Sequence, residues 1–252
     1  MHDNAVILRA DGIEKHFGRV VALRGASYEL RAGEVHAIVG DNGAGKSTLI
    51  KILSGVYRPD GGTIEIEGQK VTIDSPRAAR TLGIETVYQD LALADQLDAT
   101  SNLFLGRETF LPPPLGWFGF LDRKQMRRET ADAIKRLKVG IPSVQQPVNN
   151  FSGGQRQAIA VARAIAWGRR IVIMDEPTAA LGVRESQMVL GLIKEIREQG
   201  LSVIMISHNL PEVFLVSDRI TVLRLGSTIS TLQTKDSTVE AVVGIMTGAL
   251  AA

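Results

Sequence analysis

The segment from Val35 to Leu53 restricts the possible folds of this chain more than any other segment does. Val35–Val39 is apolar apart from His36, as expected of a strand that is covered on both faces. The glycine-rich stretch Gly40–Gly45 follows at once, and Lys46–Leu53 then has the spacing of a helix. A strand, a tight turn and a helix in direct succession predict a parallel sheet with helices packed on its faces.

The turn itself suits the binding of phosphate groups. Gly40, four further residues, Gly45, Lys46 and Ser47 make up the P-loop pattern. Glycines allow successive backbone N–H groups to face phosphate oxygens, and the following helix directs the positive end of its dipole at the same anion. Lys46 is expected to reach the β- and γ-phosphates, and Ser47 to bind Mg²⁺. The alternative is a turn with a structural role only, which the flanking strand and helix disfavour. The predicted ATP-binding residues of this segment are Gly40, Asp41, Asn42, Gly43, Ala44, Gly45, Lys46, Ser47 and Thr48.

Two acidic residues follow a second apolar run. Ile171–Met174 has the pattern of a buried strand and leads directly into Asp175 and Glu176. The C-terminal end of a buried strand is where NTPases of this kind carry the acid that binds Mg²⁺. Many strands end in acidic residues, so this pair indicates an NTPase site only because the chain also has a P-loop. We predict that Asp175 binds Mg²⁺ and that Glu176 orients and polarises the attacking water.

Strand and helix patterns divide the chain into three stretches. Roughly the first 75 residues are β-rich, helical spacing dominates from Asp95 to about Ala166, and strands alternate with helices after that. The helix-rich middle is therefore predicted to be a lobe inserted into an α/β domain. The predicted strands are Val6–Ala10, Ala26–Leu30, Thr63–Ile66, Ile171–Met174, Val203–Ile206 and a hairpin of Ile220–Leu223 with Thr228–Leu232. The predicted helices are Arg123–Leu137, Gly153–Trp167, Glu185–Glu198 and a turn near Pro211–Val216.

Composition excludes several classes of protein. The 252 residues, 44% of them hydrophobic, are enough to bury a sizeable core in one domain. The chain has no cysteine, which excludes disulfides, thiolate catalysis and Cys-based metal sites. The net charge is only +2, and the basic clusters Arg123–Arg128 and Lys135–Lys138 are best interpreted as solvated helix faces, so we expect no nucleic-acid partner. The N-terminal residues lack the pattern of a signal peptide, and no apolar run approaches the roughly 18 residues that cross a bilayer. We therefore expect a chain that works from outside the membrane.

The segment Phe110–Phe120 differs in composition from the rest of the chain. Three consecutive prolines, Pro112–Pro114, exclude a helix there and favour an extended, exposed strap. Its aromatic residues could bind a partner, but a loop held against its own domain is the better explanation.

Phe151–Gln155 is similar to the signature motif of the ABC ATPases, in which Leu is commoner at the first position. Ser152 suits a helix N-cap and two glycines follow it, so the segment is a second anion-binding helix start. A plain loop-to-helix start explains it as well when it is taken alone. Three further matches extend the resemblance over nearly the whole chain. Gln89 resembles the Q-loop residue that senses Mg²⁺ and water, His208 the switch histidine that contacts the γ-phosphate, and Phe17 the aromatic residue that stacks on adenine.

The resemblance completes the set of candidate site residues. It adds Phe17, Ser152, Gly153, Gly154 and Gln155 to the ATP-binding residues. It makes Ser47, Gln89 and Asp175 the Mg²⁺ ligands. The catalytic residues that it implies are Lys46, Gln89, Glu176 and His208.

The same resemblance implies an architecture and an assembly. The fold is α/β, with a P-loop NTPase (RecA-like) core, an N-terminal antiparallel β subdomain and an inserted helical subdomain. Residues 1–252 form one nucleotide-binding domain, in which about 91–167 are the helical subdomain and about 1–90 and 168–252 the remainder. Two chains, identical or paired, sandwich two ATP molecules, and each nucleotide contacts the P-loop of one chain and Ser152–Gly154 of the other. The dimer drives integral membrane permease subunits from the cytoplasmic face of the membrane.

One position departs from the family pattern. After Pro177–Leu181 the family usually has Asp, and this chain has Gly182. That Asp helps to align the partner's site, so its absence bears on communication between the two sites. The predicted hydrolytic residues are unaffected.

Within the family, Gly40–Tyr57, Glu176–Gly182 and Ile206–Ile220 look most like the ATPases of monosaccharide importers of the fructose, ribose and xylose group. Such systems also use a periplasmic or extracellular sugar-binding protein. An exporter subunit and a soluble ABC ATPase without a permease remain alternatives, and an unrelated P-loop kinase or GTPase is disfavoured by the signature motif. We expect part of the leucine-rich segment Gln89–Leu105 to stay exposed and to receive a helix of the permease.

Overall fold

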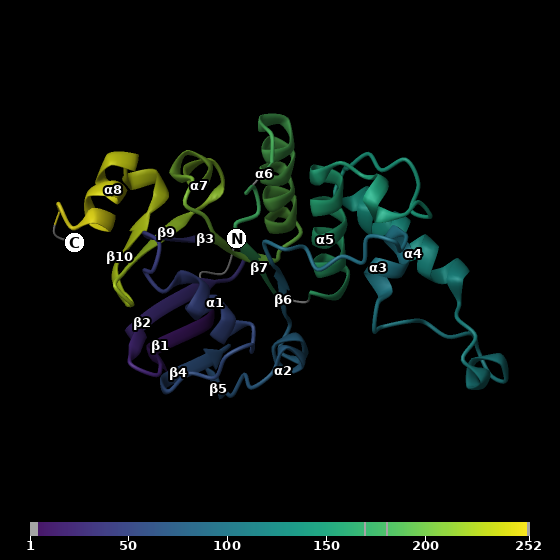
Figure 1. Ribbon diagram of the computed structural model, residues 1–252, viewed down its shortest axis with the longest axis horizontal. Coiled ribbons are helices and arrows are strands. Elements are labelled where there is room, and N and C mark those ends of the chain that lie inside the picture. Colours follow the sequence, from purple (N-terminus) through teal and green to yellow (C-terminus); the bar gives the residue numbers. More distant parts are fainter. Residues whose placement is uncertain (1–4, 169, 180, 251–252) are drawn as a thin grey trace.

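Two β-sheets make up the core of the molecule (Figure 1). The computed structural model describes residues 5–168, 170–179 and 181–250. The larger sheet has the order β10-β9-β3-β8-β7-β6 and is parallel except for the β9–β10 hairpin; the smaller has the order β2-β1-β4-β5 and is antiparallel. The strands of the larger sheet are β3 (Val35–Val39), β6 (Ile84–Val87), β7 (Ile171–Asp175), β8 (Ser202–Ile206), β9 (Arg219–Arg224) and β10 (Ser227–Gln233). Those of the smaller sheet are β1 (Val6–Phe17), β2 (Val20–Arg31), β4 (Gly61–Ile66) and β5 (Gln69–Val71).

Helices cover both sheets and form a lobe beside them. Figure 1 shows α1 between the two sheets, α6, α7 and α8 above the larger sheet, and α3, α4 and α5 to one side. No helix in the described part of the chain is both long enough and apolar enough to cross a membrane. The helices are α1 (Lys46–Leu53), α2 (Pro76–Thr81), α3 (Ala99–Phe104), α4 (Arg123–Arg136), α5 (Gly153–Trp167), α6 (Val183–Glu198), α7 (Leu210–Val216) and α8 (Val239–Thr247). Short 3-10 turns are η1 (Leu115–Phe118), η2 (Val148–Asn150) and η3 (Thr234–Asp236).

Successive side chains of β3 enter two different cores. Val35, Ala37 and Val39 join the core that the larger sheet shares with α5, α6 and α7. Ile38 joins the core that lies between this sheet, α1 and the smaller sheet. Because both faces of β3 are buried, its sequence is apolar without alternation. The α/β fold predicted from the sequence is confirmed by this arrangement.

The smaller sheet extends further than its sequence pattern indicates. The predicted strands Val6–Ala10 and Ala26–Leu30 are the distal halves of one long hairpin, β1 with β2. The pairing continues past Gly12 and Gly25 through register shifts. Bulges of this kind interrupt the alternation of apolar residues while the strands stay paired.

The segment Phe110–Phe120 does not pack against its own domain. It closes on itself, since the Leu111 N–H donates to the Phe120 carbonyl (2.9 Å), and η1 forms its tip. The side chains of Trp117 and Phe118 are 80% and 78% exposed. The prediction of a loop held against the domain is therefore wrong, because backbone bonds within the segment hold its shape.

Candidate functional site

The P-loop follows β3 at the carboxyl edge of the larger sheet and continues into α1. Gly45 has a φ of 104°, and a Cβ atom there would lie 2.7 Å from Leu23 Cδ2 and 2.9 Å from the Ala22 carbonyl oxygen. Only glycine therefore fits between the loop and β2. A cavity of about 340 Å³ opens at this point, lined by Val20–Ala22 and Asn42–Thr48.

The ammonium group of Lys46 is buried in its own loop. Its Nζ donates to the carbonyl oxygens of Gly40 (2.6 Å) and Asp41 (3.0 Å). Burial lowers the pKa of Lys46, while the negative charges of Glu176, Asp41 and Asp175 oppose that shift. The lysine thus lies within electrostatic range of the acids at the carboxyl end of β7.

Glu176 and His208 meet because their strands are neighbours. β7 and β8 are parallel and in register, with Asp175 opposite Ile206. Glu176 has a φ of 48° and donates its N–H to the Ile206 carbonyl (2.9 Å), and its Oε2 lies 2.8 Å from His208 Nδ1. His208 is mostly exposed and Glu176 mostly covered. Burial raises the pKa of Asp175, and the adjacent charge of Glu176 adds to the effect.

The remaining predicted residues of the P-loop side lie around the same region. Gln89 is exposed, two residues after β6, which is the neighbour of β7. Ser47 is exposed in the first turn of α1. Phe17 ends β1 opposite Val20, which lines the cavity, and its half-exposed ring packs edge-on against Tyr57 with centroids 5.2 Å apart.

The signature-like segment lies elsewhere. Ser152 is the N-cap of α5, and a reciprocal pair of bonds with Gln155 forms a capping box. Gly154 packs against α6, where a Cβ atom would lie 2.4 Å from Met188 Cε. In the described residues, no hydrogen bond or ion pair joins Ser152–Gln155 to the P-loop. One chain therefore brings together the P-loop, Asp175, Glu176 and His208, and leaves the start of α5 apart from them.

Comparison with known proteins identifies the family. The family described as ABC transporter matches residues 23–179, which is more than half of the chain. The chain belongs to the ABC transporter family. Its ATPase activity follows from that membership. The fructose import ATP-binding protein FrcA of Rhizobium meliloti is 50% identical over 245 residues, covering 96% of this chain and 94% of that protein. The xylose/arabinose import ATP-binding protein XylG of Sulfolobus acidocaldarius is 46% identical, covering 96% and 94%. The ribose import ATP-binding protein RbsA 2 of Rubrobacter xylanophilus is 43% identical, but only 46% of its length is covered.

Solved structures agree with this assignment. A crystal structure of the ADP conformation of an ATP-binding cassette of an ABC transporter superposes with a TM-score of 0.79 at 25% identity, covering 96% of this chain and 95% of that one. The cbiO1 protein from Clostridium perfringens, part of the ABC transporter complex cbiONQ, superposes with a TM-score of 0.78 at 26% identity, covering 92% and 90%.

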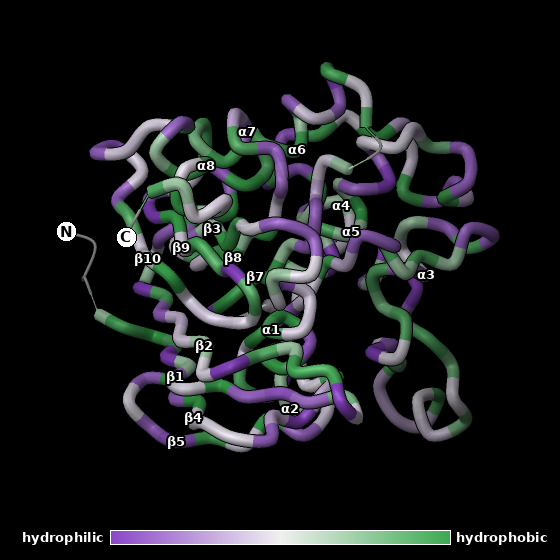
Figure 2. Tube along the Cα trace, turned by 60° about the vertical axis from the view of Figure 1, so that its left-hand side comes forward, coloured by the Kyte–Doolittle hydropathy of each residue, from purple (hydrophilic) through white to green (hydrophobic). Residues whose placement is uncertain are grey.

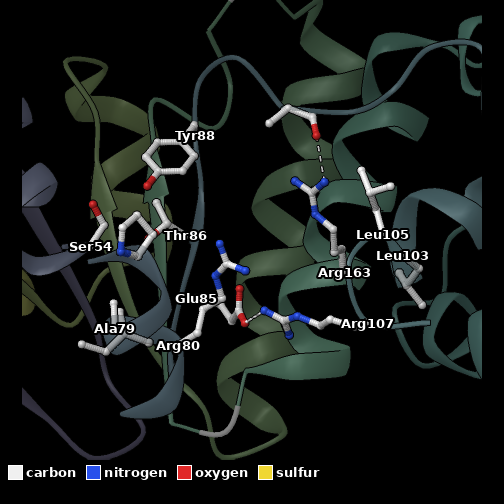
Figure 3. Close-up of a pocket in the computed structure, with 13 residues that line it drawn as sticks. Ser54, Ala79, Arg80, Glu85, Thr86, Tyr88, Leu103, Leu105, Arg107 and Arg163 are labelled. Carbon is white, nitrogen blue, oxygen red and sulfur yellow. Dashed lines mark hydrogen bonds and ion pairs between the residues drawn. The ribbon is translucent and has the colours of Figure 1, made fainter. Parts of the chain in front are cut away.

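This ABC chain has a second cavity, of about 330 Å³, between its helical lobe and α2 with β6 (Figure 3). Glu85 pairs with Arg107, and Arg80 points toward them in Figure 3. Arg163, on the lobe side, donates to the carbonyls of Ala92 (2.8 Å) and Leu91 (2.9 Å). Three arginines and one glutamate make the cavity cationic. Arg80, Arg107 and Arg163 come from three separate segments, so no local sequence pattern predicts this cavity.

Of the leucine-rich segment, only part is exposed. Leu97 and Leu105 are exposed, and Leu105 lines the arginine-rich cavity. Leu103 and Phe104 are buried in the core. The prediction that some of this surface remains accessible is confirmed, whereas its occupant stays a prediction.

Two further contacts, in the segment after Glu176, are not predicted by any sequence pattern. Gly182 begins α6 without a side-chain cap, and its N–H is accepted by Glu185 Oε2 (2.9 Å). The Thr178 hydroxyl donates to the Glu212 carboxylate on α7. The two contacts hold Thr178 against α7 and Gly182 against α6. In the sequence, only the position of Glu185, three residues after Gly182, indicates one of them.

Proposed function

We propose that this ABC chain is the ATP-binding and ATP-hydrolysing subunit that powers import of a monosaccharide of the fructose, ribose or xylose type. The observation that carries the proposal is 50% identity to a fructose import ATP-binding protein along nearly the full length of both chains. Uptake of labelled fructose, ribose and xylose by cells that lack this chain tests it. Loss of uptake of one sugar, restored by the wild-type chain but not by Glu176→Gln, is expected. Unchanged uptake of all three would favour the exporter or the soluble ABC ATPase.

The contacts at the ends of β7 and β8 support the proposed hydrolytic roles. Glu176 holds the attacking water in line with the γ-phosphorus, and His208, 2.8 Å from its carboxylate, orients Glu176 and reaches the γ-phosphate. The bond from water oxygen to phosphorus forms as the bond to the β–γ bridging oxygen breaks and ADP leaves, and the protons of the water remain with the released phosphate or pass to solvent. Lys46 exchanges its two carbonyl acceptors for phosphate oxygens, which carry a full charge and bind an ammonium more strongly. Phe17 stacks on the adenine.

The donor set at this edge suits Mg²⁺. Ser47, Asp175 and Gln89 offer oxygen ligands, which this hard cation prefers, and Mg²⁺ is commonly held by one or two carboxylates together with substrate phosphates. When bound, the ion neutralises charge that develops on the phosphates. Burial and the adjacent charge of Glu176 raise the pKa of Asp175, and a divalent ion bound there would oppose that shift.

Two copies of the chain, or one copy and a paired ATPase subunit, complete each site. The support is the separation, within one chain, of the P-loop from the start of α5, although both are helix N-termini with glycines. Ser152, Gly153, Gly154 and Gln155 then contact the nucleotide of the partner.

The arginine-rich cavity receives a cytoplasmic segment of the permease. It lies between the core and the helical lobe and combines exposed Leu105 with the guanidinium groups of Arg80, Arg107 and Arg163, so it suits a short helix that carries both apolar and acidic side chains. This contact would hold the subunit at the cytoplasmic face of the membrane.

The absence of native cysteines makes this docking testable. Leu105→Cys and Ala92→Cys, which line the cavity, should crosslink to a permease in native membranes. Lys194→Cys, on the exposed side of α6, is the matched control and should not crosslink. Equal crosslinking at all three positions, or at none, would leave the soluble ABC ATPase as the better explanation.

A further inference from the structure

The segment Phe110–Leu121, called the aromatic loop from here on, is an ordered projection from the helical lobe. Its base is a two-stranded bridge between Phe110 and Leu121, and the Asp122 N–H donates to the Thr109 carbonyl (2.8 Å). Its tip is η1, where the N–H of Trp117 donates to the Pro114 carbonyl (3.1 Å). Figure 1 shows the loop extending from the start of α4 away from both sheets, and Figure 2 shows it standing clear of the rest of the chain.

The aromatic loop exposes apolar side chains without any charge among them. Trp117 and Phe118 at the tip are about four-fifths exposed, and no residue from Phe110 to Leu121 is charged. Scattered exposed apolar residues need no explanation, but a concentrated group on a projection points to a partner. The exposed members are Phe110, Leu115, Trp117, Phe118 and Phe120.

A basic cluster lies at the base of the aromatic loop, where α4 begins. Arg123, Lys124, Arg127 and Arg128 are exposed in the first two turns of α4, and in the described residues none of them has an ion-pair partner. The helix dipole favours acids at this end, and the first turn of α4 has none. Asp122 is occupied as the N-cap, since it accepts the Gln125 N–H. The helix dipole does not favour these cations at this end, whereas an anionic surface outside the chain would.

We propose that the aromatic loop docks on the surface of an anionic lipid bilayer, with Trp117 and Phe118 among the headgroups and upper acyl chains and the basic cluster against the lipid phosphates. The order of the two layers supports a lipid surface over a protein groove. An apolar tip with tryptophan comes first and cations follow behind it, as in peptides that lie at a membrane interface. The loop begins three residues after Arg107, which lines the arginine-rich cavity. The proposal goes beyond the proposed function and does not depend on it.

The two tryptophans of the chain allow a direct measurement. Trp167→Phe leaves Trp117 as the single tryptophan. With vesicles of phosphatidylcholine and phosphatidylglycerol and no permease, its emission should shift to the blue and be quenched by lipids brominated on the acyl chains. Vesicles of phosphatidylcholine alone should give a response at least about tenfold weaker, because the attraction to the cations is lost. Trp167 packs on Phe104 and donates to the Leu103 carbonyl, so its replacement could disturb the fold. Flotation of the wild-type chain with the same vesicles therefore measures binding independently of that variant.

Paired variants separate the two layers. Trp117→Ser with Phe118→Ser, and Arg123→Gln with Lys124→Gln, should each weaken flotation by about tenfold or more. Lys135→Gln with Arg136→Gln removes two charges from the other end of α4 and should change flotation less than twofold. Basal ATP hydrolysis should be unchanged in all three, which reports that they fold.

Three results would overturn the proposal. One is no binding to anionic vesicles; another is binding that the loop variants leave intact. The third is a response of Trp117 only in vesicles that contain the permease, which would make a protein the partner. Sugar uptake and ATP hydrolysis by the wild-type chain test the proposed function separately.

Discussion

The helix that begins at Lys46 and the helix that begins at Gly153 present their first turns in opposite states. No side chain caps α1, and its cavity is open beside the P-loop. The start of α5 is closed by the capping box of Ser152 and Gln155. Among the amides of its first turn, all of which the structure describes, those of Gly153 and Gly154 are left without a hydrogen-bond partner. Both starts have glycines and the positive end of a dipole, so local sequence does not tell them apart.

The two helix starts suit different roles in a shared site. An uncapped helix start with a lysine beside it can bind a triphosphate within one chain. A capped start is stable by itself and offers few free donors, so it adds to binding only when another surface brings the nucleotide to it. We therefore expect changes near α1 to act on binding or chemistry in each chain, and changes at α5 to act on assembly.

The largest expected effect is at the acid beside α1. Glu176→Gln should lower steady-state hydrolysis by on the order of 10²–10⁴-fold, because a group that activates water is lost, while nucleotide affinity changes little. Lys46→Ala should instead weaken nucleotide affinity itself. Phosphate release and binding of a fluorescent nucleotide measure the two. Near-normal hydrolysis by Glu176→Gln would remove Glu176 from its assigned role.

A smaller but still large effect is expected at the start of α5. Gly153→Asp places a carboxylate where the partner's phosphates would lie, and it should lower hydrolysis by at least about tenfold through charge repulsion. Nucleotide affinity of the single chain should be unchanged, in contrast to Lys46→Ala. If Gly153→Asp and Lys46→Ala lower nucleotide affinity equally, the two helix starts do not differ in the roles proposed for them.

The oligomeric state of the chain is a second measurement that compares the starts of α1 and α5. ATP should convert Glu176→Gln from monomer to dimer, because the nucleotide is held and not hydrolysed. Adding Gly153→Asp to it should prevent that conversion. Light scattering across a range of protein concentrations measures the mass, and a chain that stays monomeric with ATP at saturation speaks against a shared site.

The capping box should have a modest and separable cost. Ser152→Ala removes the acceptor of the Gln155 N–H and should lower the free energy of unfolding by about 1 kcal/mol, or the Tm by roughly 2–4 °C. Ser75→Ala is the matched control, since Ser75 caps α2 by the same kind of bond, from the Ala78 N–H. Calorimetry should give similar losses for both variants, whereas only Ser152→Ala should alter hydrolysis. Equal hydrolysis by the two would make the cap purely structural.

The smallest expected effect concerns a third helix start, that of α6. Gly182→Asp restores the residue usual in the family and adds a cap, but its Cβ atom would lie 2.9 Å from Glu185 Oε2, which must turn away from the Gly182 N–H. The two effects oppose each other, so the free energy of unfolding should change by no more than about 0.5 kcal/mol. Hydrolysis at saturating ATP should stay within about twofold, and the cooperativity of ATP dependence is the quantity to compare. A large loss of hydrolysis would show that Gly182 is required.

Local pattern was enough to predict much of the architecture. The bounds of β3, α1 and α5 follow from runs of apolar residues and from helical spacing, because the burial of each element depends on its own residues. The P-loop could be recognised for the same reason, since its glycines, lysine and serine are contiguous. The division of the chain into a helical subdomain and the remainder stays a prediction.

Contacts between residues far apart in the sequence depend on the arrangement of the strands and helices. The pairing of Glu176 with His208 requires β7 beside β8 in parallel register, and neither strand's sequence specifies its neighbour. The arginine-rich cavity needs α2, β6 and the helical lobe at once. The sequence of the aromatic loop does not predict its exposure, which depends on hydrogen bonds that the loop makes with itself. The periodicity of each element can be read from the sequence alone. Contacts between separate elements form only when the apolar faces of all the elements are buried together, so no single segment specifies them.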